Sequence, residues 1–205
     1  MEIRLNMGIY SQKIISFYDE HIDTHGYGPR AVGWGDKHSQ EARFEALCKV
    51  GDLNGCLVLD VGCGLGDLWD HLLKRYQKAQ YTGIDINPRY IERAREKYPD
   101  VHFKVADFGE YEGGPFDYVV ASGAFAVKIP DYKEIYFAHI KKMFAIAQKG
   151  IAFTMLDEAQ HPNDEEYAAY SVEEVRNLCL SLADDVTVLH DYLPHDFTMI
   201  VRKNN

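Results

Sequence analysis

The sequence predicts an α/β fold built on a mostly parallel sheet of seven strands with an antiparallel last strand, preceded by an N-terminal helical lid. Two observations favour this fold. From about residue 57 onward, short runs rich in β-branched residues alternate with segments of helical spacing, which is typical of strand–helix units around a parallel sheet. Near the end of the chain, two strand-like runs are joined by a short connection, so these two strands are expected to be antiparallel.

Local features delimit the individual elements. Strands are expected at residues 57–61, 81–85, 101–105, 116–121, 150–156, 186–192 and 197–203. Helices are expected at residues 68–76, 87–98, 132–148 and 171–182. Asn87-Pro88 offers an N-cap followed by proline at the first helical position, and Ser171-Val-Glu-Glu174 is a capping box. Pro99-Asp100 and Lys149-Gly150 are helix stops.

The first 50 residues do not follow this alternation. Residues 9–22 and 39–50 have helical spacing, and the stretch between them is rich in glycine and contains Pro29. We therefore predict a lid of helices and a loop across the mouth of the sheet, formed by residues 1–50, and a cofactor-binding domain formed by residues 51–205.

Composition and charge are those of an ordinary globular protein, with 46% apolar and 26% charged residues. The formal net charge of −10 opposes binding to a phosphate backbone, so a nucleic-acid partner is disfavoured. No apolar run approaches the ~20 residues that span a membrane, and the N-terminus lacks a signal-peptide pattern, so a cytoplasmic location is expected. The four cysteines form no Cys-x-x-Cys pair, and neither they nor the carboxylates cluster at metal-ligand spacing, so no metal site is expected.

A glycine-rich turn, Gly62-Cys-Gly-Leu-Gly66, directly follows the first expected strand. Glycines in such a turn let the backbone approach a ligand without an intervening Cβ, and the spacing differs from the G-x-G-x-x-G of dinucleotide-binding folds. Asp60 lies inside the preceding strand, where a carboxylate needs a cationic or hydrogen-bonding partner. The amino group of a methionine moiety would be such a partner, whereas a pyrophosphate would be repelled. Asp85 ends the second strand, where it can accept hydrogen bonds from both ribose hydroxyls.

Four motifs, in order along the chain, resemble those of the class I S-adenosylmethionine (SAM)-dependent methyltransferases. Val58-Leu-Asp-Val-Gly-Cys-Gly-Leu-Gly66 resembles their first motif, and Gly83-Ile-Asp85 resembles their second. Ala106-Asp107-Phe108 matches the adenine-binding position, and Phe116-Asp-Tyr-Val-Val120 resembles the fourth-strand motif. The resemblance covers about residues 55–203. It implies a Rossmann-like, doubly wound sheet with an inserted antiparallel last strand, and SAM as the cofactor, with S-adenosyl-L-homocysteine (SAH) as its product.

The family's pattern implies a role for each cofactor contact. Asp60 would serve the amino group, Asp85 the ribose and Asp107 the exocyclic amine of adenine, while a backbone N–H beside Asp107 would reach the adenine ring. The glycines would line the methionine part, and Ile86 would pack on the adenine face. The expected cofactor contacts are Asp60, Gly62, Cys63, Gly64, Gly66, Asp85, Ile86, Asp107, Phe108 and Ser122.

The acceptor pocket is expected beyond the carboxyl ends of the fourth and fifth strands, under the N-terminal lid. Its expected residues are Tyr18, Tyr27, Trp34, Phe125 and Lys128. The segment after the fourth strand has no histidine, although many relatives carry one there, so a general base is sought in the lid, at His21 or His25. Methyl transfer from a sulfonium is an in-line displacement, and positioning with desolvation can supply most of its acceleration without a dedicated catalytic side chain.

The compact size, acidic surface and aromatic lid favour a small-molecule acceptor. Two alternatives stay open at this point: a methyltransferase acting on protein or RNA, and a SAM-binding protein without catalytic activity. A dehydrogenase is opposed by Asp60 and by the glycine spacing. The sequence does not specify the acceptor atom or the oligomeric state.

Overall fold

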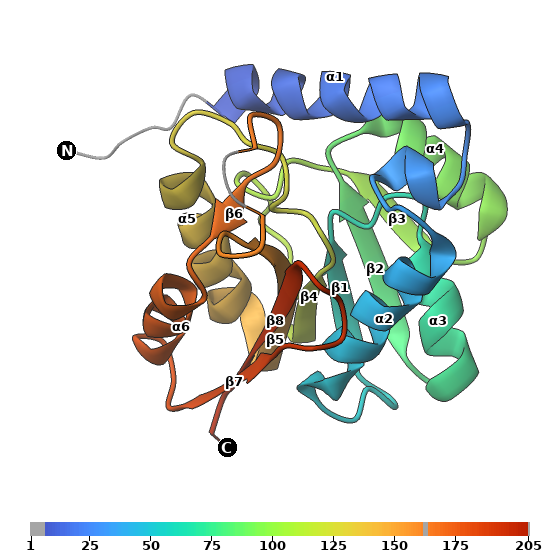
Figure 1. Cartoon of the computed structure of the whole chain (residues 1–205). Helices are drawn as coiled ribbons and strands as arrows, with labels where there is room; N and C mark the ends of the chain where they lie inside the picture. The colour runs from blue at the N-terminus through green and yellow to red at the C-terminus, as the bar shows by residue number, and fades with distance from the viewer. Residues whose placement is uncertain (1–6, 162–163, 205) are drawn as a thin grey trace.

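The computed structural model describes residues 7–161 and 164–204, and its centre is a single sheet (Figure 1). Seven strands follow the spatial order β3-β2-β1-β4-β5-β8-β7, and a two-residue strand, β6, pairs with β5 off this path. The strands are β1 (Leu57–Val61), β2 (Gln80–Asp85), β3 (His102–Val105), β4 (Phe116–Ala121), β5 (Ala147–Asp157), β6 (Ala169–Tyr170), β7 (Asp185–Leu189) and β8 (Asp196–Arg202).

The strand directions confirm the predicted Rossmann-like fold. Within the group β1 to β5, every pair of neighbouring strands is parallel. Strand β8 lies between β5 and β7 and is antiparallel to both. From β1 the chain adds β2 and β3 on one side, and it then crosses over to add β4 and β5 on the other side. This reversal makes the carboxyl ends of β1 and β4 the switch point, where open α/β sheets bind their ligands.

Helices cover both faces of the sheet, as expected for a doubly wound fold (Figure 1). The described helices, with η marking a short 3-10 helix, are α1 (Met7–His25), η1 (Pro29–Val32), α2 (Lys37–Leu47), η2 (Cys48–Val50), α3 (Asp67–Arg75), α4 (Pro88–Lys97), α5 (Tyr132–Ile146) and α6 (Val172–Leu180). Helices α5 and α6 pack on one face, and α2, α3 and α4 pack on the other. No described helix is both long and apolar enough to span a membrane.

Helix α1 crosses the end of the sheet at which the parallel strands finish (Figure 1). Its side chains bond to three segments that follow strands. Ser11 donates to Asp107 after β3, Asp19 accepts from Asn87 after β2, and Lys13 donates to the carbonyl of Lys128 after β4. The predicted placement of α1 over the mouth of the sheet agrees with these bonds, while the predicted domain boundary at residue 50 stays a prediction. Residues 37–50 cover a face of the sheet rather than its mouth.

Several element ends differ from the predicted ones because pairing overrides local helical spacing. The expected helix to residue 148 stops at Ile146, since Ala147 pairs with Phe116 of β4 and already belongs to β5. Strand β7 ends at Leu189, where its pairing with β8 stops at Thr198, although β8 itself continues to Asp196. The predicted caps of α4 and α6 are confirmed: Asn87 accepts from the N–H of Arg89 at 2.8 Å, and Ser171 from that of Glu174 at 3.3 Å.

Candidate active site

A pocket lies at the carboxyl ends of the central strands, beneath α1. It contains about 1060 Å³ of space between protein atoms, part of it open to solvent. Its walls come from the glycine-rich turn after β1, the end of β2, residues 106–108 after β3, residues 122–125 after β4, helix α1 and helix α5. Because segments that follow four different strands meet here, the parallel sheet itself positions the site.

The glycine-rich turn is shaped for close approach. The N–H groups of Gly62 and Cys63 both bond to the carbonyl of Ile84, at 2.8 and 3.0 Å, which holds the turn against β2. A Cβ at Gly62, where φ is +71°, would lie 2.7 Å from the Cβ of Ala124. The turn and the segment after β4 therefore meet at a distance that only glycine allows.

Gly66 differs from the other two glycines of the turn, because it is not among the described residues that line the pocket. It has a φ of +75° just before α3, and a Cβ there would lie 2.7 Å from the ring of Phe103. The position that a side chain would occupy at Gly66 is therefore filled by the packing between α3 and β3. The expected contact between Gly66 and the cofactor stays a prediction.

Asp60 is buried at the pocket wall, with 2% of its surface exposed. One carboxylate oxygen accepts a hydrogen bond from the Tyr81 hydroxyl at 2.6 Å, while the other, Oδ1, is buried without a described partner. Burial raises the pKa of Asp60 to about 7, against the opposing effect of the Tyr81 hydrogen bond. An orphaned carboxylate oxygen at a pocket wall fits the cationic amino group of a methionine moiety.

Asp85 and Asp107 hold the turns that border the pocket. Asp85 accepts the N–H groups of Gly64 at 2.9 Å and Asn87 at 2.8 Å, and burial raises its pKa to about 6. Asp107 accepts the N–H of Gly109 at 2.8 Å and the hydroxyl of Ser11 at 2.6 Å. Each carboxylate oxygen has a second lone pair, so both residues can still accept hydrogen bonds from ribose hydroxyls or an adenine amine.

The other expected cofactor contacts also face this space. Ile86, Phe108 and Ser122 line the pocket, as do Gly62, Cys63 and Gly64 of the turn. The hydroxyl of Ser122 is buried without a described hydrogen-bond partner. The orphaned oxygens of Asp60 and Ser122 and the glycine cradle together fit a polar, amino-acid-bearing cofactor.

The expected acceptor and base residues divide into two groups. Tyr18, Trp34 and Phe125 line the pocket. Tyr27 and Lys128 lie outside the described lining: Tyr27 is 51% exposed, and Lys128 donates to the carbonyl of Asp164 at 2.6 Å.

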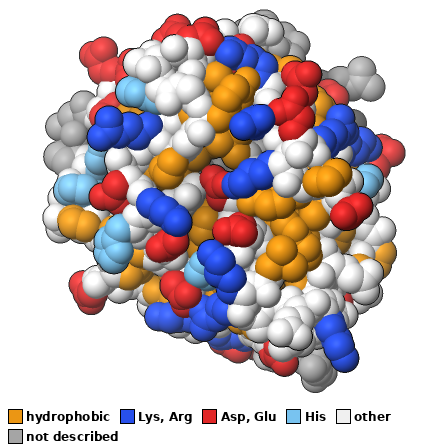
Figure 2. Space-filling model, turned by 90° about the vertical axis from the view of Figure 1, so that its right-hand side faces the viewer, with side chains coloured by type: hydrophobic (Ala, Val, Ile, Leu, Met, Phe, Trp, Pro, Cys, Tyr) orange, Lys and Arg blue, Asp and Glu red, His pale blue; other side chains and the backbone are white. Residues whose placement is uncertain are grey.

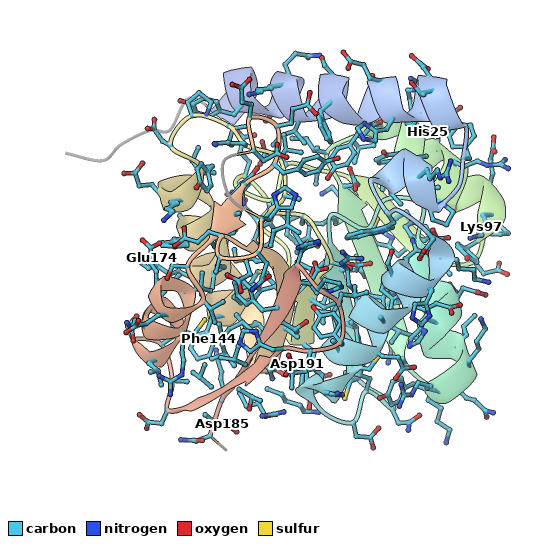
Figure 3. The ribbon with its side chains drawn as sticks, in the orientation of Figure 1. His25, Lys97, Phe144, Glu174, Asp185 and Asp191 are labelled. Atoms are coloured by element: carbon cyan, nitrogen blue, oxygen red, sulfur yellow. The ribbon has the colours of Figure 1, made fainter. Side chains whose placement is uncertain are left out.

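The two lid histidines also lie outside the described lining of the pocket, because α1 continues past it after Tyr18. His21 is about one turn further along and pairs through Nδ1 with the carbonyl of Phe17, at 2.9 Å. His25 lies at the end of the helix, where Figure 3 labels it. A base role for either histidine stays a prediction that their position does not support.

The sequence reasoning missed His139, which lines the pocket from the middle of α5. Ile135, Tyr136 and His139 fall on one face of α5 at helical spacing, and all three line the pocket. Their helical spacing in the sequence indicates that the three residues share one face of the helix. The neighbouring sequence does not show whether that face lines a pocket or packs into the core.

A second, smaller pocket adjoins the first and contains about 500 Å³. Four residues line both spaces: Tyr18, Val32, Trp34 and Gly123. The second pocket is completed by residues at the ends of β4, β5 and β8 and by the lid, namely Gly33, Arg43, Ala126, Thr154, Met155, Leu156, Tyr167 and Asp196. These are the segments from which an acceptor site was expected.

The charged groups of the second pocket are paired with each other. Arg43 donates to Asp196 through Nε at 3.0 Å and through Nη2 at 2.6 Å, and both side chains are buried. The Arg43 guanidinium also lies 4.2 Å from the centre of the Trp34 ring. A Cβ on Gly123 would be 2.4 Å from the far edge of that ring, so Trp34 lies directly against the segment after β4, between the two pockets.

Fold and site together define a methyltransferase with the class I architecture. A family model described as "Methyltransferase domain" matches residues 58–146. The protein Rv1506c of Mycobacterium tuberculosis (strain ATCC 25618 / H37Rv), whose name assigns it to the methyltransferases, is 33% identical over 155 residues, which cover 70% of this chain and 91% of that protein. The chain belongs to the methyltransferase domain family and is a SAM-dependent methyltransferase.

Two further similarities extend the comparison. A trans-aconitate 2-methyltransferase of Rhodopseudomonas palustris (strain BisB5) is 28% identical over 131 residues, which cover 62% of this chain but only 49% of that enzyme. The crystal structure of magnesium protoporphyrin IX methyltransferase (ChlM) from Synechocystis PCC 6803, with bound SAH, has a TM-score of 0.69 at 15% identity and covers 95% of this chain and 99% of that chain. This second similarity concerns the fold.

Proposed function

We propose that this methyltransferase transfers the methyl group of SAM to a small molecule bound in the second pocket. The observation that carries the proposal is the wall that the two pockets share, formed by Tyr18, Val32, Trp34 and Gly123. Donor and acceptor must meet in line for a displacement at carbon, so an acceptor site has to open onto the cofactor site. Among the described residues, the second pocket adjoins the cofactor pocket across these four shared residues, which supports its assignment as the acceptor site.

In this proposal the chain binds and orients both reactants. SAM supplies a methyl group activated by its sulfonium. Asp60 holds the amino group, Asp85 the ribose and Asp107 the adenine amine, while Tyr18 and Trp34 exclude water from the junction of the two pockets. No described histidine lines the second pocket, so a proton lost by the acceptor would pass to solvent or to Asp196, the one carboxylate among its described lining residues.

Size and charge support a small acceptor. The second pocket contains about 500 Å³ of space between protein atoms, part of it open to solvent, which offers room for a small molecule. The Arg43–Asp196 pair leaves the pocket close to neutral, with aromatic and aliphatic walls. The relative named above for trans-aconitate has a small-molecule acceptor by its name. On the face that Figure 2 shows, acidic and basic side chains are interspersed, which does not favour an RNA-binding surface there. A cytoplasmic location remains the expectation from sequence.

Transfer of labelled methyl groups tests the proposal directly. The protein is incubated with methyl-labelled SAM and a cell extract, and the products are separated by size. We expect label in the small-molecule fraction. Label confined to macromolecules would contradict a small acceptor and favour the protein or RNA alternative. Tight SAH binding without any transfer would instead favour a non-catalytic SAM-binding protein.

A variant of the second pocket ties the activity to that space. Ala126 lines the second pocket but is not among the described residues of the first, so Ala126→Phe should fill the acceptor site. We expect loss of transfer with an unchanged affinity for SAH, measured by calorimetry. Ala138→Phe, at an exposed position on α5, is the matched control and should leave both unchanged. Full transfer by Ala126→Phe would place the acceptor elsewhere.

A further inference from the structure

His139 lies in the cofactor pocket among aromatic rings. Its imidazole is 5.5 Å from the ring of Phe108, 6.1 Å from that of Tyr136 and 6.4 Å from that of Phe125, measured between ring centres. Of the histidines in the described residues, only His139 lines either pocket. Its Nε2 atom is buried and has no hydrogen-bond partner among those residues.

The surroundings keep this imidazole neutral. Burial lowers its pKa to about 4, with Lys142 acting in the same direction and Asp107 opposing. The ammonium of Lys142 already has partners of its own: it donates to the carbonyl of Gly109 at 2.8 Å and lies 5.3 Å from the Phe108 ring centre. A neutral imidazole has one N–H donor and one acceptor nitrogen. Leaving its buried Nε2 unpaired costs free energy, which a ligand could recover.

The position of His139 places it at the adenine end of the site. It contacts Phe108, the residue directly after Asp107, and Asp107 is close enough to influence its charge. It does not line the second pocket, so it is separated from the proposed acceptor. This location argues against a role as the base for methyl transfer and in favour of contact with the nucleoside.

Adenine presents its amine between two ring nitrogens, N1 and N7, that accept hydrogen bonds. Asp107 can accept only from the amine, because a carboxylate has no hydrogen to donate. The backbone N–H expected beside Asp107 can serve only one of these two ring nitrogens. Recognition of the other needs a second N–H donor, and a neutral histidine with its hydrogen on Nε2 supplies one. We propose that His139 is an adenine-recognition residue, whose Nε2–H donates to one of the two ring nitrogens that flank the amine held by Asp107. The proposal rests on the adenine position assigned to Asp107.

Analogues of SAH that lack one ring nitrogen test this assignment. Binding of SAH, 1-deaza-SAH and 7-deaza-SAH is measured by calorimetry for the natural protein and for His139→Leu. We expect His139→Leu to weaken SAH binding by about tenfold, the loss of one hydrogen bond in a buried site. We also expect one of the two analogues to bind the natural protein and His139→Leu equally. That analogue lacks the ring nitrogen that would accept the hydrogen bond from His139, so losing the imidazole costs it nothing. His139→Gln, which keeps an N–H donor, should recover part of the affinity for SAH.

Stability separates recognition from a structural role. Because Nε2 has no described partner, His139→Leu should not lower the melting temperature of the free protein. Equal weakening of SAH and of both analogues, or a large fall in melting temperature, would overturn the proposal. Failure of the natural protein to bind SAH at all would be a different result, because it would remove the cofactor pocket itself.

Discussion

At the scale of single residues, we expect Asp60 to couple protonation to cofactor binding. Its pKa of about 7 in the folded protein lies above the ordinary value of 3.8 because the carboxylate is desolvated. The native state therefore binds more protons than the unfolded chain between these values, and the contribution of Asp60 to the free energy of unfolding falls as pH rises through this interval. A cationic amino group placed beside Oδ1 would reverse that preference and favour the ionised form.

Binding of SAH should therefore strengthen with pH. We expect the affinity to rise by about tenfold between about pH 6 and pH 7.5, with release of a proton on binding. Calorimetry in buffers of different ionisation enthalpy measures both quantities. Asp60→Asn should weaken binding and remove most of this dependence above about pH 7, where Asp85 with its pKa of about 6 is largely ionised. Asp100→Asn, at an exposed position, is the control, and an identical pH slope in Asp60→Asn would contradict the role of Asp60.

The expected cofactor contacts that line the pocket lie at the carboxyl end of a strand or just after it. Asp85 and Asp107 could be placed because the carboxyl ends of parallel strands meet at one edge of a sheet. His139 could not, because it reaches the pocket only through the packing of α5 on the sheet. The three glycines of the turn look equivalent in sequence, yet a packing contact with Phe103 distinguishes Gly66 from the other two.

At the scale of elements, the contact between α2 and β8 depends on a buried ion pair. Arg43 of α2 and Asp196 at the start of β8 have side chains only 10% and 6% exposed. Arg43 also donates to the carbonyl of Ser39 at 3.0 Å, which fixes the guanidinium relative to its own helix. The pair thus connects α2 to β8, and its guanidinium lies 4.2 Å from the centre of the Trp34 ring at the boundary of the two pockets.

Removing one partner should be costly. Asp196→Asn leaves the buried guanidinium without its counter-charge, and we expect it to lower the free energy of unfolding by about 3 kcal/mol. The exposed pair of Lys74 and Asp70 is the matched control, for which Asp70→Asn should cost less than about 1 kcal/mol. Urea denaturation measures both values. Equal effects of the two substitutions would show that the buried pair has no special importance.

Helix caps were predictable at this scale, whereas strand ends were not. Asn87 and Ser171 bond to backbone N–H groups two and three residues away, so their sequence neighbours suffice to identify them. The start of β5 at Ala147 and the existence of β6 depend on pairing with Phe116 and Leu156, which are distant in sequence. Local spacing contains no information about those partners.

At the scale of the whole molecule, the cofactor pocket joins parts of the chain that are remote in sequence. Helix α1, the turn after β1, the loops after β3 and β4, and α5 all contribute walls. Each hydrogen bond or packing contact to a bound ligand therefore favours the assembled fold over the unfolded chain.

SAH should raise the melting temperature markedly. At a concentration of about 100 times its Kd, the ligand adds about 2.7 kcal/mol to the free energy of unfolding. For a chain of 205 residues this corresponds to a shift of roughly 5–10 °C, measurable by calorimetry or by circular dichroism. Asp85→Ala should reduce the shift at the same SAH concentration. An unchanged shift in this variant would show that Asp85 does not contribute to cofactor binding.

The position of β8 in the sheet also has a consequence for folding during synthesis on the ribosome. Although β8 is an interior strand with almost every residue buried, its first residue is Asp196, far along the chain from the end of β5 at Asp157. A ribosome that has completed β5 must still add α6 and β7 before β8 emerges. During that interval the hydrogen-bonding edge of β5 is open, apart from the short pairing with β6, so the nascent chain exposes a template for intermolecular pairing. Productive folding therefore depends on keeping that edge apart from other chains until β8 has been synthesised.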